Sequence, residues 1–316
     1  MTGCASSERV LERFEYTAII MAAEARIVLY APDERSAATA ARSAFDRMHE
    51  LEEVMSDYRP QSELMQLGAG PPGVAHPVSD DLFRLLDRAV ALAERTDGAF
   101  DITIGPLTHL WRRARASGTP PDPDAIRTAM DRCGPHLLSL DHAARTVTLH
   151  EREMQLDPGG IGKGFAVDEA AAQLNERGIE HFLIGLAGDL RSGLPPPGET
   201  GWRIAIDAPD VADDEARDEA RGGDRHLRYL PAHRAISTSG DHFQALEHEG
   251  TRYSHIIDPR TGHAVTDQIT VTVIADDAVT ADALATALSV LGPAHAAPAL
   301  AEFPGIEASF IRAPER

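Results

Sequence analysis

The segment 253–262, YSHIIDPRTG, concentrates groups that could do chemistry within one short run. It contains the titratable imidazole of His255, the carboxylate of Asp258 and the guanidinium of Arg260, and its proline and glycine favour a turn. A polar surface loop without any function would look similar, because loops are solvated at no cost. Loops are also where binding and catalytic residues gather, so this segment is a candidate site.

A glycine-rich run, DPGGIGKG at 157–164, precedes a stretch with helical character. Glycines let the backbone approach a ligand closely, and the first turn of a helix offers free N–H groups to phosphate oxygens. Lys163 adds a positive charge. The run is neither a P-loop, since no Ser or Thr follows the lysine, nor a G-x-G-x-x-G motif. It is either a phosphate-binding turn or a turn that only permits tight packing.

Asp282 and Thr286 are one helical turn apart in an alanine-rich stretch, so their side chains share a face. A carboxylate and a hydroxyl suit a hard cation such as Mg²⁺, which takes oxygen ligands and shares them with phosphates. The alternative is an aspartate that serves only the cap and the dipole of the helix.

Two further runs place polar groups near the ends of predicted elements. AISTSGD at 235–241 predicts a strand ending in hydroxyl residues, although Ser239 or Asp241 could instead cap a following helix. GAFDITIGPL at 98–107 predicts a buried turn, with a tryptophan anchor shortly after it. The sequence has no H-E-x-x-H and no G-x-S-x-G motif, which argues against a zinc protease and an α/β-hydrolase.

Hydrophobic periodicity predicts an α+β fold in one continuous unit, because groups of strands alternate with helices. The predicted helices are 35–55, 79–95, one from Asp122 or Asp124 to Gly134, 165–177 closed by Gly178, and 281–291 stopped by Gly292 and Pro293. The predicted strands are two within 15–30, a hairpin of 146–149 with 154–156, and 181–186, 202–206, 235–237 and 269–274.

Composition narrows the partners and the location. The net charge of −20 over 316 residues argues against nucleic acid and anionic membranes, which need a basic face. Part of the acidity lies at 207–226, which we interpret as an insertion or loop within a domain spanning 14–316, after a polar and disordered tail at 1–13. No run approaches the roughly 18 apolar residues of a membrane span. Two cysteines form no disulfide framework, and we expect a cytoplasmic location, or a periplasmic or membrane-anchored one if an export signal was removed.

Taken together and in order, these motifs resemble those of the ApbE family of FAD:protein FMN transferases. The resemblance runs from about Thr17 to the C-terminus. The matching runs are SDYRPQSEL at 56–64, FDIT at 100–103 with GPL at 105–107, GGIGKG at 159–164 with Asp168, GDL at 188–190, TSGD at 238–241, YSHIIDPRTG at 253–262 and DALATA at 282–287.

The resemblance implies a T-fold-like α+β architecture with mixed or antiparallel sheets, and an enzyme that moves FMN from FAD to a Thr or Ser hydroxyl of an acceptor flavoprotein. AMP leaves and Mg²⁺ assists. Two alternatives stay open, namely hydrolysis of FAD to FMN and AMP, and FAD binding without catalysis. An imidazole titrates near neutral pH, so we expect His255 to be the base that activates the hydroxyl.

The resemblance also implies the residues of the site. The metal ligands are expected to be Asp282, Thr286 and a backbone carbonyl at or near Gly162. The expected FAD contacts are Met21, Ser56, Tyr58, Asp101, Thr103, Gly160, Lys163, Asp168, Ser239, His255 and Ile256.

Four positions depart from the family pattern. Ala22 and Ala187 stand where family members usually have glycine, Gly68 stands where asparagine is usual, and Pro158 stiffens the approach to the glycine run. Each is expected to loosen or reshape FAD binding.

Overall fold

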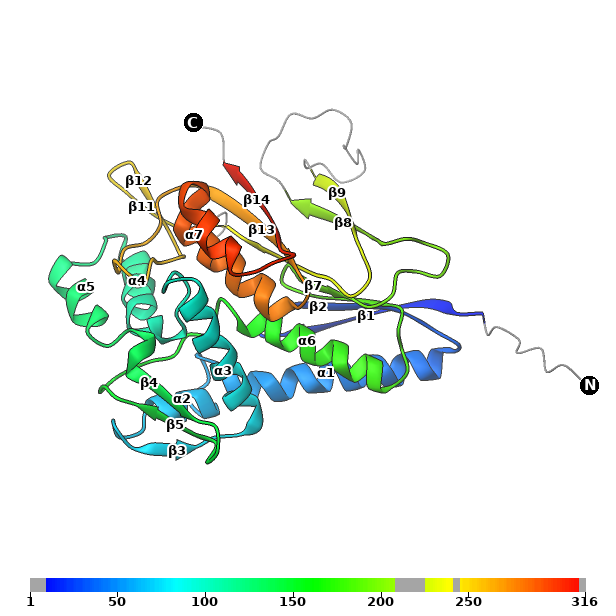
Figure 1. Cartoon of the computed structure of the whole chain (residues 1–316), viewed down its shortest axis with the longest axis horizontal. Helices are drawn as coiled ribbons and strands as arrows, with labels where there is room; N and C mark the ends of the chain where they lie inside the picture. The colour runs from blue at the N-terminus through cyan, green and yellow to red at the C-terminus, as the bar shows by residue number, and fades with distance from the viewer. Residues whose placement is uncertain (1–9, 208–224, 241–244, 313–316) are drawn as a thin grey trace, which may run out of the picture.

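A seven-stranded antiparallel sheet forms the centre of the computed structural model, which describes residues 10–207, 225–240 and 245–312 (Figure 1). Each neighbouring pair of strands is antiparallel, in the order β1-β2-β6-β7-β10-β13-β14. The strands are β1 (Glu12–Ile20), β2 (Ala23–Ala31), β6 (Phe182–Leu186), β7 (Asp189–Ser192), β10 (Ala235–Ser239), β13 (Ile269–Ala275) and β14 (Glu307–Arg312).

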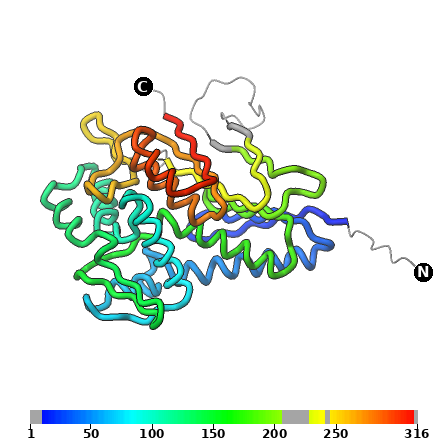
Figure 2. The backbone as a smooth tube through the Cα atoms, viewed as in Figure 1, coloured from blue at the N-terminus to red at the C-terminus, as the bar shows by residue number. Residues whose placement is uncertain are grey.

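Three helices cover one face of this sheet, as the backbone trace also shows (Figure 2). They are α1 (Glu34–Met55), α6 (Gly162–Glu176) and α7 (Ala278–Ala301). Alternate residues of β2, including Ile27 and Leu29, are fully buried in the main core. Buried alanines at 37, 40, 41 and 44 give α1 a small-residue face, which lets it approach its neighbours closely.

The start of α7 is fixed twice. Asp277 caps it by accepting a hydrogen bond from the Thr280 amide at 2.7 Å. Asp168, on α6, accepts the amides of Ala278 and Val279 at 3.0 and 2.9 Å. Helix α7 is long and apolar enough to pass a composition test for a membrane span, but its buried residues pack as a core helix against β10, β13 and α6.

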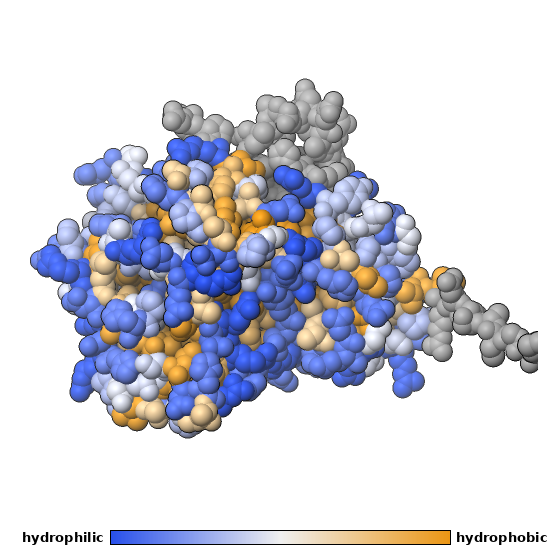
Figure 3. Space-filling view, in the orientation of Figure 1, coloured by the Kyte–Doolittle hydropathy of each residue, from blue (hydrophilic) through white to orange (hydrophobic). Residues whose placement is uncertain are grey.

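The other face of the sheet is partly covered by the hairpin of β8 (Trp202–Asp207) and β9 (Arg225–Leu230). Trp202 and Ile204 pack there against Val28 and Ile236. In the space-filling view, hydrophilic residues predominate on the side of the molecule that carries the helices, with apolar residues among them (Figure 3).

A second group of elements lies beyond the end of the sheet, toward the left of Figure 1. Trp111 anchors it, since its ring is buried and its Nε1 donates to the Gly262 carbonyl at 2.9 Å. The group comprises α2 (Glu63–Gly68), β3 (Ala75–Pro77), α3 (Asp80–Arg95), η1 (Ile102–Ile104), α4 (Gly105–Ser117), α5 (Pro123–Met130), η2 (Pro135–Leu137), β4 (Leu138–Asp141), β5 (Thr146–Leu149), β11 (Ala245–His248) and β12 (Thr251–Ser254).

Several predicted elements differ from the observed ones. The partners of β5 are β3 and β4, whereas 154–156 is not a strand, so the predicted hairpin was wrong. Ser239 ends β10, and the helix expected to follow it was wrong, because the next described element is β11; Asp241 lies outside the described residues. Asp122 does cap a helix, but α5 ends at Met130 rather than Gly134.

The predicted ends of several segments can also be compared with the structure. The backbone leaves the helical conformation at Gly292 (φ 65°, ψ 170°), where the predicted helix stops, although α7 resumes beyond it. β1 begins at Glu12, within the range 1–13 that was predicted as a tail. The acidic segment falls between β8 and β9, and most of it lies outside the described residues.

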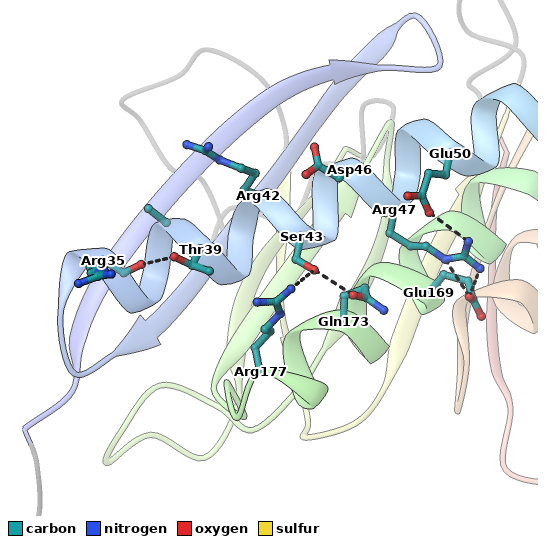
Figure 4. A pocket seen from close by; sticks show the side chains of 11 residues that line it. Arg35, Thr39, Arg42, Ser43, Asp46, Arg47, Glu50, Glu169, Gln173 and Arg177 are labelled. Atoms are coloured by element: carbon teal, nitrogen blue, oxygen red, sulfur yellow. Dashed lines mark hydrogen bonds and ion pairs between the residues drawn. The ribbon is translucent and has the colours of Figure 1, made fainter.

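Helices α1, α3 and α6 are joined by a network of charged side chains beside an open groove of about 760 Å³. Figure 4 shows the part of this network that links Arg47 on α1 to Glu169 on α6. Arg47 donates to Asp81 at 2.5 and 2.7 Å and to Glu169 at 2.6 Å, and Arg84 contacts the same two carboxylates. Hydrogen bonds from Arg47 lower the pKa of Asp81. Burial raises the pKa of Glu169, but its bonds to Arg84 and Arg47 outweigh burial and leave the pKa lowered.

We expect Arg47→Met to lower the free energy of unfolding at pH 7 by about 2–4 kcal/mol, because two poorly exposed carboxylates lose a hydrogen-bonded partner. The side chains of Arg47, Asp81 and Glu169 are 17%, 20% and 18% exposed. Carboxylates with lowered pKa stabilise the fold above their unfolded pKa of about 4, and this contribution is lost as the pH falls through the folded pKa. The difference from the wild type should therefore shrink in acid, as measured by chemical denaturation at a series of pH values.

Arg42→Met is the matched control, since Arg42 is exposed and lines the same groove. A loss at Arg47 no larger than at Arg42, or one that stays constant down to about pH 3, would contradict the role of the network.

Candidate active site

A cavity of about 300 Å³ gathers most of the motifs found in the sequence. Its lining comes from segments that are far apart along the chain but meet at one end of the central sheet. The lining residues are Tyr58, Ala99, Phe100, Asp101, Ile104, Thr108, Arg112, Arg115, Asp157, Gly159, Gly160, Lys163, Ala187, Thr238, Ser239, Gly240, His255, Ile256, Ile257, Pro259 and Thr286.

The glycine run lets two helices meet at this cavity. A Cβ on Gly164 would lie 2.2 Å from the Ala278 carbonyl oxygen, so α6 and α7 could not approach this closely with any other residue there. A Cβ on Gly160 would lie 2.9 Å from Oγ1 of Thr286. The glycines therefore bring the turn before α6 into contact with the first turns of α7, which carry Asp282 and Thr286.

Lys163 lies between two buried carboxylates. Its Nζ is 2.7 Å from Asp189 and 3.1 Å from Asp282, and both aspartates are 2% exposed. The Gly164 amide donates to Asp282 at 3.0 Å, and the Ser237 hydroxyl donates to Asp189. Burial lowers the pKa of Lys163, but the two carboxylates outweigh burial and leave it raised. Burial and repulsion from Asp189 raise the pKa of Asp282, against the opposing effect of Lys163.

The run 253–262 separates its charged groups in space. Arg260 folds back onto Asp258, donating from its amide at 2.9 Å and from Nε at 2.8 Å, so these two charges compensate each other. The Ser254 hydroxyl accepts the Ile256 amide at 3.1 Å and holds the backbone turn next to His255. His255 and Ile256 line the cavity, whereas the ion pair does not.

One wall of the cavity is a face of α4, with Thr108, Arg112 and Arg115 at helical spacing. Arg112 donates to Asp57 at 2.7 Å and to Asp157 at 3.4 Å. The other oxygen of Asp157 accepts the Gly159 amide at 2.8 Å, so Arg112 is linked through Asp157 to the glycine turn. Burial and repulsion from Asp157 raise the pKa of Asp57, despite its bond to Arg112.

Two predicted contacts form the base of this wall. Asp101 accepts both the amide and the hydroxyl of Thr103 at 2.8 Å, and the Thr103 hydroxyl accepts the Gly134 amide at 2.6 Å. Asp101 lines the cavity, but Thr103 is buried behind it. Burial raises the pKa of Asp101. Tyr58 is 74% exposed, and the Arg112 guanidinium lies 4.8 Å from its ring centroid.

The predicted site residues therefore fall into two groups. Eight of them line the cavity, namely Tyr58, Asp101, Gly160, Lys163, Ser239, His255, Ile256 and Thr286. Six do not: Met21, Ser56, Thr103, Gly162, Asp168 and Asp282.

The six outside the lining act at different places. Asp282 contacts Lys163 from outside the cavity lining, and Gly162 begins α6 next to the cavity. Ser56 ends α1, and its hydroxyl accepts the Tyr58 amide at 3.3 Å.

Asp168 departs most clearly from the expected FAD contact. Both of its oxygens are bonded to amides of α7, and burial raises its pKa to about 6 against these bonds. In this structure it positions α7 rather than facing the cavity.

Sequence reasoning did not single out Arg112 and Arg115 as site residues. Their spacing from Thr108 is helical, but 105–117 was not predicted as a helix, so the shared face was not visible.

Comparison with known proteins identifies the family of the chain. The sequence pattern of the ApbE family matches residues 21–310. The chain belongs to the ApbE family. It is 33% identical to the FAD:protein FMN transferase of Vibrio cholerae over 79% of this chain and 73% of that protein, and 32% identical to that of Treponema pallidum over 98% and 86%.

Solved structures of the family agree with the fold. The flavin transferase ApbE from Vibrio cholerae is 29% identical with a TM-score of 0.82, covering 96% of this chain and 94% of that one. The ApbE protein from Thermotoga maritima is 27% identical with a TM-score of 0.81, covering 96% and 97%. The predicted family and α+β class are confirmed.

Two departures from the ApbE pattern fall in tight turns at the cavity end of the sheet. Met21 and Ala22 join β1 to β2 with φ of 51° and 58°, and Ala187 and Gly188 join β6 to β7 with φ of 51° and 97°. The two turns are neighbours, since β2 pairs with β6 and the Ala187 amide donates to the Glu24 carbonyl at 3.4 Å. Left-handed backbone favours glycine, so both alanines are strained.

We expect Gly164→Ala to destabilise the fold by more than about 3 kcal/mol, because the new methyl group would force α6 and α7 apart. Gly118→Ala is the control, since an added Cβ on Gly118 meets nothing within 4 Å and its only cost is the positive φ of 75°. It should cost only about 1 kcal/mol. Urea denaturation of both variants checks this, and equal losses would contradict the close helix contact.

We expect Ala22→Gly and Ala187→Gly each to raise the free energy of unfolding by about 0.5–1 kcal/mol, because relief of left-handed strain exceeds the entropy cost of glycine. The same substitution at Ala38, within α1, should lower it by about 1 kcal/mol. Opposite signs in thermal or chemical denaturation support the strain, whereas a loss at all three positions would refute it.

Proposed function

We propose that this chain transfers FMN from FAD to a Thr or Ser hydroxyl of an acceptor protein, with the help of Mg²⁺ and with release of AMP. Family membership supports the reaction class, since the relatives compared above are named FAD:protein FMN transferases. The observation that carries the proposal is the position of Asp282. Its buried carboxylate contacts Lys163 and the Gly164 amide, next to a cavity that Thr286 and His255 also line.

The residues present fit a hard divalent cation. Asp282 supplies a carboxylate and Thr286 a hydroxyl on the same face of α7, and a backbone carbonyl at or near Gly162 completes the expected set. Asp189 places a second buried carboxylate beside the first, against a single ammonium, which leaves an excess of negative charge to attract a cation. Within the residues that the structure describes, no three or more His, Cys, Asp or Glu side chains are grouped so that they could hold a metal ion, so a zinc-type site is not favoured.

Bound Mg²⁺ would neutralise negative charge on the phosphate oxygens. Within the chain, the amides of Gly159, Ile161 and Gly162 are bonded to Asp157 and Pro158, and the Gly164 amide is bonded to Asp282, so the glycine turn is held in a fixed shape beside the cavity. Asp168 and Gly164 hold α7 against α6, so the expected ligands stay beside that turn.

The acceptor hydroxyl is a weak nucleophile and needs a base. His255 takes its proton as the hydroxyl oxygen forms a bond to the phosphorus of the FMN half. The bond from that phosphorus to the bridging oxygen breaks, and AMP leaves with that oxygen. Because Asp258 is paired with Arg260, His255 is the group of its segment that is positioned for this step.

We expect wild-type protein with FAD, Mg²⁺ and a threonine-containing acceptor peptide to give a peptide carrying FMN and an equal amount of AMP. His255→Ala should lower the transfer rate by about 10²–10⁴-fold while FAD still binds, because a general base is lost. Asp282→Ala should lower it by at least about 10²-fold, and EDTA should do the same until Mg²⁺ is restored. Mass spectrometry of the peptide and quantitation of AMP measure both products.

His263→Ala is the control for His255, because His263 directly follows the segment 253–262 but is exposed and outside the cavity lining. Release of AMP without modified peptide would indicate FAD hydrolysis instead. FAD that binds but stays intact would indicate a binding protein. Full transfer by His255→Ala would remove the base from the mechanism.

A further inference from the structure

Three cationic side chains line the cavity, and two of them are already paired. Lys163 is bonded to the buried carboxylates of Asp189 and Asp282. Arg112 is bonded to Asp57 and Asp157, whose side chains are also poorly exposed. In each cluster two carboxylates surround one cation, so neither cluster presents net positive charge to an anionic ligand.

Arg115 is the third cation, and its charge is not balanced. Its Nη1 is shielded from solvent and has no hydrogen-bond partner within 10–207, 225–240 and 245–312, the residues that the structure describes. No carboxylate in those ranges lies within ion-pair distance of it. Burial and repulsion from Arg112, one turn away on α4, lower the pKa of Arg115.

A shielded guanidinium N–H without an acceptor is costly, and the cost is removed when an oxyanion binds. A guanidinium presents a planar fork of donors that matches the oxygens of phosphate or carboxylate. Arg115 belongs to the lining of the same cavity as Lys163 and the glycine turn, so a ligand that fills the cavity comes within its reach.

We propose that Arg115 is the cation of the cavity that binds a phosphate oxygen of the dinucleotide substrate directly. The assignment rests on the proposed function in taking FAD as that substrate. A pyrophosphate that enters this cavity meets the Lys163 ammonium, which is already bonded to two carboxylates. It also meets the Arg112 guanidinium, which is bonded to two other carboxylates. Arg115 supplies the positive charge that these clusters do not, whereas Lys163 serves to hold Asp189 and Asp282 in place.

The test compares two ligands that differ in their phosphates. FAD and riboflavin are titrated into the folded full-length protein with Mg²⁺ and without acceptor, and binding is followed by flavin fluorescence, with FAD integrity checked by chromatography. Arg115→Gln should weaken FAD binding by about tenfold or more, and riboflavin binding should change by less than about twofold, since riboflavin has no phosphate. Arg115→Lys should restore part of the FAD affinity, because it keeps the charge.

Arg113→Gln is the matched control. Arg113 is exposed on another face of α4, and its substitution removes the same charge from the protein. FAD affinity should be unchanged in this variant. The FAD affinity of the wild type should also fall more steeply with added salt than that of Arg115→Gln.

Equal weakening of FAD and riboflavin by Arg115→Gln would overturn the proposal, because it would indicate that Arg115 only shapes the cavity. Unchanged FAD affinity together with a raised KM for the acceptor peptide would also overturn it. That result would indicate that Arg115 binds a carboxylate of the acceptor. Failure of the wild type to bind FAD would instead refute the proposed function, and the assignment would fall with it.

Discussion

The contact between the start of α6 and the start of α7 is the constraint on which the rest of the cavity depends. It exists because Gly164 has no side chain where the Ala278 carbonyl passes, and because Asp168 holds the first amides of α7. Through this contact a glycine turn from the middle of the chain and a carboxylate from its last helix meet at one place. Neither segment could form this part of the structure alone, since the turn carries Lys163 and the helix carries Asp282 and Thr286.

In the cavity, the pairing of charged side chains matters more than the net charge of the protein. The protein carries an excess of negative charge, yet its proposed substrate is an anion. Lys163 and Arg112 are each held by two carboxylates, which fixes their positions and removes them as free cations. The remaining positive charge of Arg115 is therefore the feature that would attract a pyrophosphate, and the paired carboxylates of Asp189 and Asp282 would attract a divalent cation.

Sequence patterns predicted the parts of this structure that depend on local chemistry. The long amphipathic helices, the caps at Ser79 and Asp122 and the stop at Gly292 all follow from residue types within one or two turns. The structure places Asp282, an expected site residue, beside the glycine turn, where the Gly164 amide donates to its carboxylate.

Features set by long-range packing were not visible in the sequence. The strand at 146–149 pairs with 138–141 on one edge and with 75–77 on the other, whereas Met154 and Leu156 are buried in the core without forming a strand. The lysine of the glycine run suggested a phosphate contact, but two carboxylates from distant strands and helices surround it. Arg115 could be recognised only once the helix around it placed its side chain in the cavity wall.

The backbone leaves the helical conformation at Gly292, which divides α7 into two parts. The first part carries Asp282 and Thr286 and is held to α6 by Asp168, whereas the second leads to the edge strand β14. Ala296 and Ala299 bury the second part in the main core. The interruption therefore lets the outer part take its direction toward the sheet edge from its own packing, while the first part follows α6.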